Sequence, residues 1–289
     1  MIKIGFNSYS YHKALVNGKM DVFALIDEVA KLGAEHIEFS PGTTLPFNGN
    51  DEYIQKVKKA CADAKLEISS YTVGANFVQA DADAVRVEIE RVKTEIDTAA
   101  ALGVTKMRHD CGWRPAAEAT LEMFEKDLPL FIDCCGELAD YAKQFGITTS
   151  IENHGFYVQG SERVKRIVLG VNRDNFRTTL DVGNFLCVDE DPASAVMNNI
   201  NIASHIHFKD FVVKHKKPLQ VEGYITTAHQ NYIHGAVTGD GDVELEKITS
   251  IILNSGYDGY LSIEFEGWED PMFACPRAFN NVKILLGRQ

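Results

Sequence analysis

Acidic and histidine residues stand at the ends of four short β-branched or aromatic runs in the second half of the sequence. These residues are Glu152, Asp181, His207 and Glu264. Three carboxylates buried together would cost several kcal/mol per ion without a counter-charge, and a bound cation removes that cost. Three carboxylate oxygens and one imidazole suit Mn, Mg, Co or Zn and leave coordination positions open for substrate. We therefore expect one divalent metal ion in a catalytic site, and the alternative is four separate residues that make caps and salt bridges.

The same four runs alternate between polar and apolar side chains. They are residues 150–154, 179–183, 205–209 and 261–266. Successive side chains of a strand point to opposite faces, so each run has one polar and one apolar face. Because the apolar faces can pack on helices, the polar faces are left pointing inward, with the four candidate ligands at matching strand ends.

Strand candidates recur along the whole chain, and helical periodicity fills the stretches between them. The strand candidates are residues 2–7, 35–39, 66–71, 104–109, 147–152, 176–181, 204–209 and 259–266. Clear helical segments are residues 21–33, 81–102, 117–145 and 243–255. This alternation predicts an α/β fold, with a single (β/α)8 TIM-barrel domain over residues 1–289. A doubly wound sheet is the alternative, but no G-x-G-x-x-G motif follows the first strand.

One connection, from Phe211 to Asp242, is long and has no helical period. Loops of this kind are more often functional than idle. In a barrel it would lie on the C-terminal face, where active sites are found. We expect it to cover part of the site, with the Gly-Asp-Gly-Asp turn at 239–242 as an anchor.

The composition limits the partners of the chain. With 29 Lys+Arg against 41 Asp+Glu, the formal net charge is -12, which disfavours nucleic acid and anionic membrane surfaces. No stretch approaches the ~20 apolar residues that a membrane helix needs. Six scattered cysteines contain no C-x-x-C pair and suit a reducing compartment. We expect a cytoplasmic protein without nucleic-acid or membrane partners, and the oligomeric state, homodimer and homotetramer included, stays open.

Five motifs occur in an order, and at strand ends, that are specific to one superfamily. They are Ile-Glu-Asn-His-Gly at 151–155, Leu-Asp-Val-Gly-Asn at 180–184, His-Ile-His-Phe-Lys-Asp at 205–210, Gly-Asp-Gly-Asp-Val at 239–243 and Ser-Ile-Glu-Phe-Glu-Gly at 262–267. With these motifs the whole chain resembles the xylose isomerase-like TIM barrels of the sugar phosphate isomerases and epimerases. That superfamily includes the ketose 3-epimerases and inosose-processing enzymes. The resemblance assigns the metal to the same four residues as the strand-end argument.

The resemblance also implies a metal-dependent isomerase or epimerase that acts on a small sugar, polyol or sugar phosphate. A metal that chelates a carbonyl and an adjacent hydroxyl acidifies the C–H between them, so a carboxylate can remove the proton and form an enediolate. In the 3-epimerase branch two metal-bound glutamates act from opposite faces, and here they would be Glu152 and Glu264. Lys209 and Arg108 would donate to the enediolate oxygen. His154 shares the face of Glu152 and would orient substrate or carry a proton.

The chain departs from several branches of the superfamily. Ketose 3-epimerases carry a histidine and an arginine where this chain has Asn184 and Val213, so the substrate contacts must differ. Asn184 also argues against the apurinic endonucleases, whose three-zinc cluster needs a histidine there. A metal-dependent lyase of the 3-dehydroshikimate dehydratase type is the alternative, because the Glu-x-His pair at 152–154 and Arg108 permit it, although Leu186 replaces its lysine. A barrel that binds metal and sugar without turnover is the alternative from another class.

Five residues are candidates for contact with a small carbohydrate substrate. They are Arg108, His109, Asn184, Lys209 and Tyr71. His109 and Tyr71 stand at strand ends and would either line the sugar pocket or pack. Glu38, inward on the second strand, would hydrogen-bond a neighbouring strand end or reach substrate.

Overall fold

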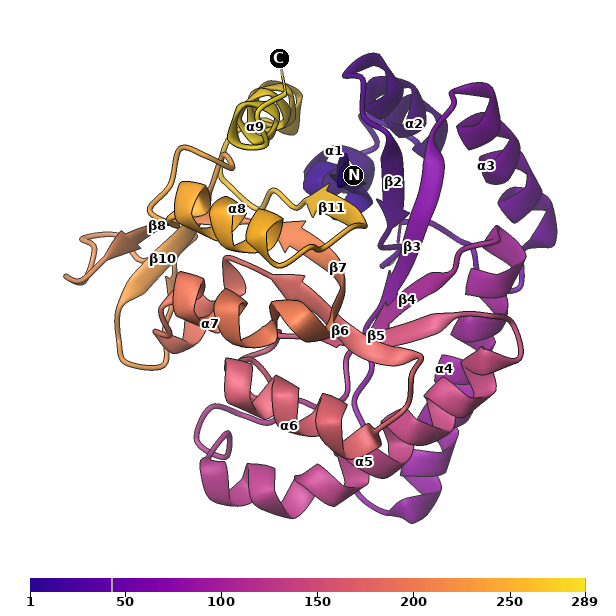
Figure 1. Ribbon diagram of the computed structural model, residues 1–289, viewed down its shortest axis with the longest axis vertical. Helices are drawn as coiled ribbons and strands as arrows, with labels where there is room; N and C mark the ends of the chain where they lie inside the picture. The colour runs from indigo at the N-terminus through magenta and orange to yellow at the C-terminus, as the bar shows by residue number, and fades with distance from the viewer. Residues whose placement is uncertain (43, 289) are drawn as a thin grey trace.

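The computed structural model describes residues 1–42 and 44–288 of the chain. Parallel strands close into a barrel in the order β1-β11-β7-β6-β5-β4-β3-β2 (Figure 1). They are β1 (Lys3–Asn7), β2 (His36–Phe39), β3 (Glu67–Val73), β4 (Lys106–His109), β5 (Thr148–Glu152), β6 (Phe176–Asp181), β7 (Ala203–Phe208) and β11 (Tyr260–Ile263). Every expected strand is present, so the TIM-barrel prediction is confirmed and the doubly wound alternative is excluded.

Helices surround the barrel (Figure 1). They are α1 (His12–Val16), α2 (Val22–Lys31), α3 (Asp51–Asp63), α4 (Ala82–Leu102), α5 (Leu121–Lys143), α6 (Ser161–Val171), α7 (Pro192–Asn199), α8 (Leu245–Asn254) and α9 (Pro271–Leu285), with short 3-10 turns η1 (Ser8–Tyr11), η2 (Asn184–Val188) and η3 (Ile200–Ile202). Asp81 caps α4 by accepting the backbone N–H of Ala84 at 2.9 Å. Helix α5 begins later than expected, because Thr120 Oγ1 accepts the N–H of Met123 at 3.2 Å. Within the described residues, no helix has both the length and the apolar character that crossing a bilayer requires.

Each barrel strand presents one apolar and one polar face. Ile151, Leu180 and Ile206 are fully buried in the hydrophobic core. On the opposite faces, the hydroxyls of Ser150 and Thr179 lie 2.8 Å apart between β5 and β6. The polar faces therefore line the barrel interior, as the alternation predicts.

The first and last strands close the barrel. Strand β11 pairs in parallel with β1 on one side and with β7 on the other. Near the end of the chain, Arg288 donates to the Ile2 carbonyl and pairs with Glu35 Oε2 at 2.7 Å. The two ends of the chain are thus held together beside the β1–β11 seam.

The long connection between β7 and α8 contains a small antiparallel sheet of order β8-β10-β9. Its strands are β8 (Asp210–Lys214), β9 (Ile225–Thr226) and β10 (Tyr232–Ala236). We expected only an irregular loop here. The aromatic and β-branched run Phe211-Val212-Val213 was the available signal for β8. In the view of Figure 1, β8 and β10 lie on the side of the barrel that carries α7 and α8 and away from β2 and β3.

Asp210 anchors the end of this connection. Its carboxylate accepts the backbone N–H groups of Gly239 and Gly241, both at 2.9 Å, and of Val243 at 3.1 Å. A Cβ on Gly241 would lie 2.2 Å from Asp210 Oδ1, so only glycine fits at this approach. The prediction that the turn at 239–242 is a loop anchor is confirmed.

Two contacts place the small sheet at the C-terminal end of the barrel. The N–H of Ala228 donates at 2.9 Å to the carbonyl of Cys187, which follows β6. Gly235 forms a parallel bridge with Gly267, which follows β11. The connection therefore lies beside the strand ends that carry the candidate ligands.

A buried histidine, His36 of β2, packs inside the barrel against Gly5 of β1. A Cβ on Gly5 would lie 2.6 Å from the His36 ring, so β1 needs glycine at this position. Burial first, and then the neighbouring His205 imidazole, lowers the pKa of His36 to about 3. The folded state therefore binds fewer protons than the unfolded state, in which histidine titrates near ~6.5. This contribution to stability is present above that pH and is lost as the pH falls toward the folded pKa.

We expect protonation of His36 to lower the unfolding free energy by up to about 1.4 kcal/mol per pH unit below about pH 6. His36→Gln removes the titration and keeps a donor for the Leu261 carbonyl, which is 3.1 Å from His36 Nε2. Urea unfolding of both proteins between neutral pH and mildly acidic pH measures the two slopes. The wild type should show the steeper loss, and equal slopes would contradict the prediction.

Candidate metal centre

The structure brings the four expected ligands together at the C-terminal end of the barrel. One ligating atom of each residue lies within 4.8 Å of those of the others. His207 Nδ1 is 3.6 Å from Glu152 Oε1, 3.9 Å from Asp181 Oδ2 and 3.6 Å from Glu264 Oε2. All four residues are buried. We call Glu152, Asp181, His207 and Glu264 the quartet.

Strand register explains why residues so far apart in sequence converge. Glu152 and Asp181 are the last residues of β5 and β6, and Asp181 pairs in register with His207 of β7. Ser262 of β11 is also in register with His207, and Glu264 follows two residues later on the same inward face. The C-terminal ends of these parallel strands therefore lie at one level of the barrel.

The quartet fits a divalent metal. His207 Nδ1 and Asp181 Oδ2 are buried and have no hydrogen-bond partner among the residues that the structure describes. A buried polar atom without a partner is costly, and here two of them face each other across the quartet. Ligand atoms that each lie ~2.1 Å from an ion are separated by roughly 3 to 4 Å, which is the spacing seen here. Carboxylate oxygens with one imidazole suit Mg, Mn, Co or Zn.

Cationic side chains flank the quartet on two sides. Arg108 Nη2 lies 2.6 Å from Glu152 Oε2, and Lys209 Nζ lies 2.7 Å from Glu264 Oε2. Burial opposes ionisation of Glu152, but Arg108 and His207 outweigh it and lower the pKa of this carboxyl. Burial likewise opposes ionisation of Glu264, and Lys209 and His207 hold its pKa well below the usual range. Both glutamates are therefore carboxylates, as proton acceptors must be.

Asn184 joins the two flanks. Its Nδ2 donates to Glu152 Oε1 at 3.0 Å, and its Oδ1 accepts from Lys209 Nζ at 3.2 Å. Its backbone N–H donates to Asp181 Oδ1 at 2.9 Å. Asn184, Arg108 and Lys209, three of the expected substrate-contacting residues, thus lie against the quartet.

Two acidic residues at the site were given no role in the sequence analysis. Asp110 Oδ1 lies 3.3 Å from His154 Nδ1 and 3.3 Å from Arg108 Nη2. Glu266 Oε1 lies 2.8 Å from Lys209 Nζ. Both carried a readable signal, since Asp110 directly follows the strand at 104–109 and Glu266 shares the inward face of Glu264.

His154 lies at the edge of the site. Its side chain is 48% exposed, whereas those of the quartet are buried. Burial lowers and Asp110 raises the pKa of His154, and the net shift is upward. The imidazole of His154 is thus held by Asp110 at its Nδ1 atom, and part of the ring is in contact with solvent.

Two expected substrate-contacting residues are not brought to the quartet, which corrects that part of the site. The Tyr71 hydroxyl donates at 2.8 Å to Glu95 of α4, outside the barrel. His109 is fully buried, with its Nδ1 2.8 Å from the Asp110 carbonyl oxygen and its ring 6.2 Å from that of Phe176. Both side chains pack in the outer layer, because the inward positions of β3 and β4 belong to their neighbours.

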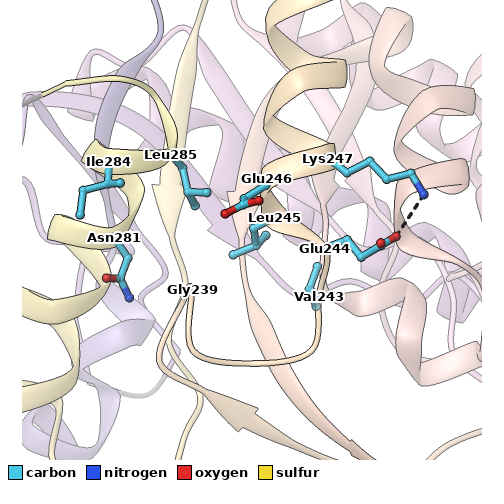
Figure 2. A pocket seen from close by; sticks show the side chains of 9 residues that line it. All are labelled: Gly239, Val243, Glu244, Leu245, Glu246, Lys247, Asn281, Ile284 and Leu285. Atoms are coloured by element: carbon cyan, nitrogen blue, oxygen red, sulfur yellow. Dashed lines mark hydrogen bonds and ion pairs between the residues drawn. The ribbon is translucent and has the colours of Figure 1, made fainter.

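Two pockets of the structure differ in their position relative to the quartet. A pocket of about 140 Å³ lies next to Glu264 and is lined by Tyr9, His12 and Glu266, among others. A larger pocket of about 460 Å³ lies between α8 and α9, outside the barrel (Figure 2). Quartet residues line neither pocket, but the smaller one is lined by Phe265 and Glu266, which directly follow Glu264 in the chain, so it is the smaller pocket that lies beside the quartet.

Comparison with known proteins gives the family of this barrel. The sequence model of the xylose isomerase-like TIM barrel family matches residues 26–278. The chain belongs to this family. The expected superfamily is thereby confirmed.

Relatives of this xylose isomerase-like barrel include sugar-processing enzymes. An inosose dehydratase of Clostridium perfringens (strain 13 / Type A) is 26% identical over 165 residues, which are 56% of this chain and 54% of that relative. The chain thus spans about half the length of the curated relatives it matches.

Two solved structures share the fold over nearly their whole length. The IolI protein with a bound zinc atom gives a TM-score of 0.78 at 18% identity and covers 99% of this chain and 98% of its own. A D-psicose 3-epimerase from Clostridium cellulolyticum H10, with D-tagatose, gives 0.77 at 16% identity and covers 99% of both chains. At this identity the likeness establishes the fold of the xylose isomerase-like barrel and nothing more.

Proposed function

We propose that this barrel is a divalent-metal-dependent sugar or polyol isomerase or epimerase that works through an enediolate. The observation that carries the proposal is the buried quartet, in which His207 Nδ1 and Asp181 Oδ2 face each other at 3.9 Å and neither makes a hydrogen bond within the described part of the chain, although Lys209 Nζ lies 3.3 Å from Asp181 Oδ2. The quartet would hold one Mn, Mg, Co or Zn ion. A protein that shares the fold, the IolI protein, is described with a bound zinc atom, which supports a metal in this barrel.

When bound, the metal supplies Lewis acidity that makes the C–H beside a carbonyl acidic. Glu152 is the base we assign to that proton, because Arg108 keeps it ionised and Asn184 fixes its other oxygen. Glu264 is the second acid–base group, held by Lys209 at 2.7 Å. Arg108 and Lys209 would also donate to the enediolate oxygen as negative charge develops on it.

Charge at the site favours an uncharged substrate over a sugar phosphate. Carboxylates outnumber cations around the quartet. The carboxylates are Asp110, Glu152, Asp181, Glu264 and Glu266, and the cations are Arg108 and Lys209. Each cation already contacts at least two carboxylates, and with all five carboxyls ionised and His154 neutral a divalent metal would still leave the group slightly negative. We therefore propose a neutral keto-sugar or keto-polyol as the substrate, since a phosphate would meet repulsion.

A second candidate is a lyase that removes water from such a ketone. The Asp110–His154 pair favours it, because a histidine oriented by a carboxylate at the edge of the site is suited to protonate a leaving hydroxyl. The inosose dehydratases among the relatives support the same alternative. Both candidates share the first step, removal of a proton next to the carbonyl.

The experiment is proton–deuterium exchange into ketoses, inososes and their phosphorylated counterparts, followed by NMR in D2O. Metal-stripped protein is refilled with Mn, Mg, Co or Zn, and a parallel assay follows loss of water. Metal-dependent exchange into a neutral ketone without water loss supports the isomerase or epimerase. Dehydrated product supports the lyase, and metal binding without any exchange or turnover would point to a binding-only barrel and refute the proposal.

A further inference from the structure

A further carboxylate, which does not belong to the quartet, lies behind His207 on the side away from the other quartet residues. Glu38 of β2 is fully buried, and its Oε2 is 2.9 Å from His207 Nε2. The other nitrogen of the same ring, Nδ1, faces the carboxylates of the quartet. The imidazole is therefore clamped between Glu38 on one side and the candidate metal position on the other.

The chemistry of Glu38 and His207 determines which ring nitrogen of His207 carries the hydrogen atom in this contact. A carboxylate can only accept, so the hydrogen between Glu38 Oε2 and His207 belongs to Nε2. In the neutral imidazole Nδ1 then keeps its lone pair directed at the quartet, which is the form that binds a metal. Glu38 itself is held, because the Thr72 hydroxyl donates to its Oε1 at 2.6 Å. His205 Nε2 lies 3.3 Å from the same Oε2 and 2.8 Å from Ser262 Oγ.

Glu38, His205 and His207 also lie close enough together to hold an ion of their own. Their hydrogen bonding argues against that role. Both oxygens of Glu38 are already engaged, by Thr72 and His207. An ion on each side of His207 would require an imidazole that has lost both ring hydrogens, far from its neutral form. The group therefore supports the quartet and does not duplicate it.

We infer that Glu38 is a positioning residue, which fixes the ring orientation and tautomer of His207 for metal binding. The inference rests on the proposed metal centre, not on the reaction that the centre performs. Carboxylate–histidine–metal arrangements of this kind typically raise metal affinity by about 10-fold to 100-fold. Thr72 completes the support by fixing the carboxylate.

The test compares metal affinity in the folded full chain of wild type, Glu38→Leu, Glu38→Gln and Thr72→Val. A chromophoric chelator in competition gives the dissociation constant for Zn or Mn, and visible absorption of the Co-loaded protein reports the ligand geometry. Asp127→Asn is the matched control. Asp127 is likewise a buried carboxylate, bonded to Arg114 at 2.6 Å and to Tyr157, and it belongs to α5.

We expect Glu38→Leu to weaken metal binding about 10-fold to 100-fold and the control to stay within about twofold of wild type. Glu38→Gln should lie between them, because the amide oxygen can still accept from His207. A folded Glu38→Leu protein with wild-type affinity and an unchanged Co spectrum would overturn the inference. Should Glu38→Leu not fold, unchanged affinity in both Glu38→Gln and Thr72→Val would overturn it equally. Wild-type protein that binds no metal would also overturn the inference. If wild type and the control bind metal most tightly, Glu38→Gln less tightly and Glu38→Leu least, but no exchange activity is found, only the proposed reaction is refuted.

Discussion

Glu152→Gln is expected to reduce metal-dependent proton exchange at least 100-fold, within the ~10²–10⁴ range that a positioned general base contributes. The amide keeps the shape of the side chain, but it does not take up the proton and cannot form the ion pair with Arg108 Nη2, which is 2.6 Å from Glu152 Oε2 in the wild type. It also removes the charge of one candidate metal ligand. The assay is NMR-detected exchange in D2O with metal-saturated protein, together with a metal titration that separates lost affinity from lost chemistry.

A matched control for this variant is Glu88→Gln. Glu88 lies on α4, accepts from Arg91 Nε at 2.8 Å and from the Asn76 N–H at 3.0 Å, and touches no quartet residue. Its exchange rate should equal that of wild type. Exchange in metal-loaded Glu152→Gln at the rate of this control would exclude Glu152 as the base.

Asp210→Ala is expected to lower the unfolding free energy by about 3 to 5 kcal/mol, because several buried N–H groups would each cost about 1 to 3 kcal/mol without an acceptor. The carboxylate accepts four backbone N–H groups, from Phe211, Gly239, Gly241 and Val243. Alanine would leave these donors without a partner in a buried turn. Urea unfolding gives the free energy, and amide hydrogen exchange should show lost protection at Gly239 and Gly241.

The same turn supplies a control for this prediction. Asp240 pairs with Arg277 at the surface, where ion pairs are worth about 0 to 1 kcal/mol. Asp240→Ala should therefore cost less than Asp210→Ala by several kcal/mol. Similar losses in the two variants would mean that Asp210 does not hold the connection in place.

Strand alternation was enough to predict the barrel and to bring the quartet together. The reason is geometric: parallel strands with apolar outer faces place their inward C-terminal residues at one level, whatever their spacing in sequence. Glu152 and Asp181 end their strands in the structure as they did in the sequence analysis. Glu264 follows its strand by one residue, and the inward face still carries it into the quartet.

Face assignment failed where two neighbouring residues were both expected at the site. Arg108 and His109 are consecutive in β4, so only one of them can point inward, and Arg108 does. At β3 the expected strand stopped at Tyr71, but the structure continues it to Val73, and Thr72 is the inward residue. A register shift between β2 and β3 at Ile37/Glu38 sets this face, and no local pattern reveals such a shift.

The strands of the long connection were missed for a different reason. Strand β9 has only two residues, and β10 contains glycine, so alternation is too short to detect there. Strand β10 is stabilised by pairing with β8, β9 pairs in turn with β10, and Asp210 anchors the end of the connection; all of these are contacts between residues distant in sequence or outside the strand itself. Sequence periodicity indicates the local preference for a helix or a strand and contains no information about such contacts.

The seam between β1 and β11 has a consequence for how the chain folds as it is made. Strand β1 emerges first from the ribosome, yet one of its two partners is the last strand of the barrel. Until Tyr260–Ile263 has been synthesised, β1 and β7 both have an unpaired edge, and exposed edges invite pairing with other chains. Glu264 joins the quartet only at that same late stage. Closure of the barrel and assembly of the candidate metal centre therefore depend on the same late segment, so a nascent chain cannot bring the quartet together before that segment has been made.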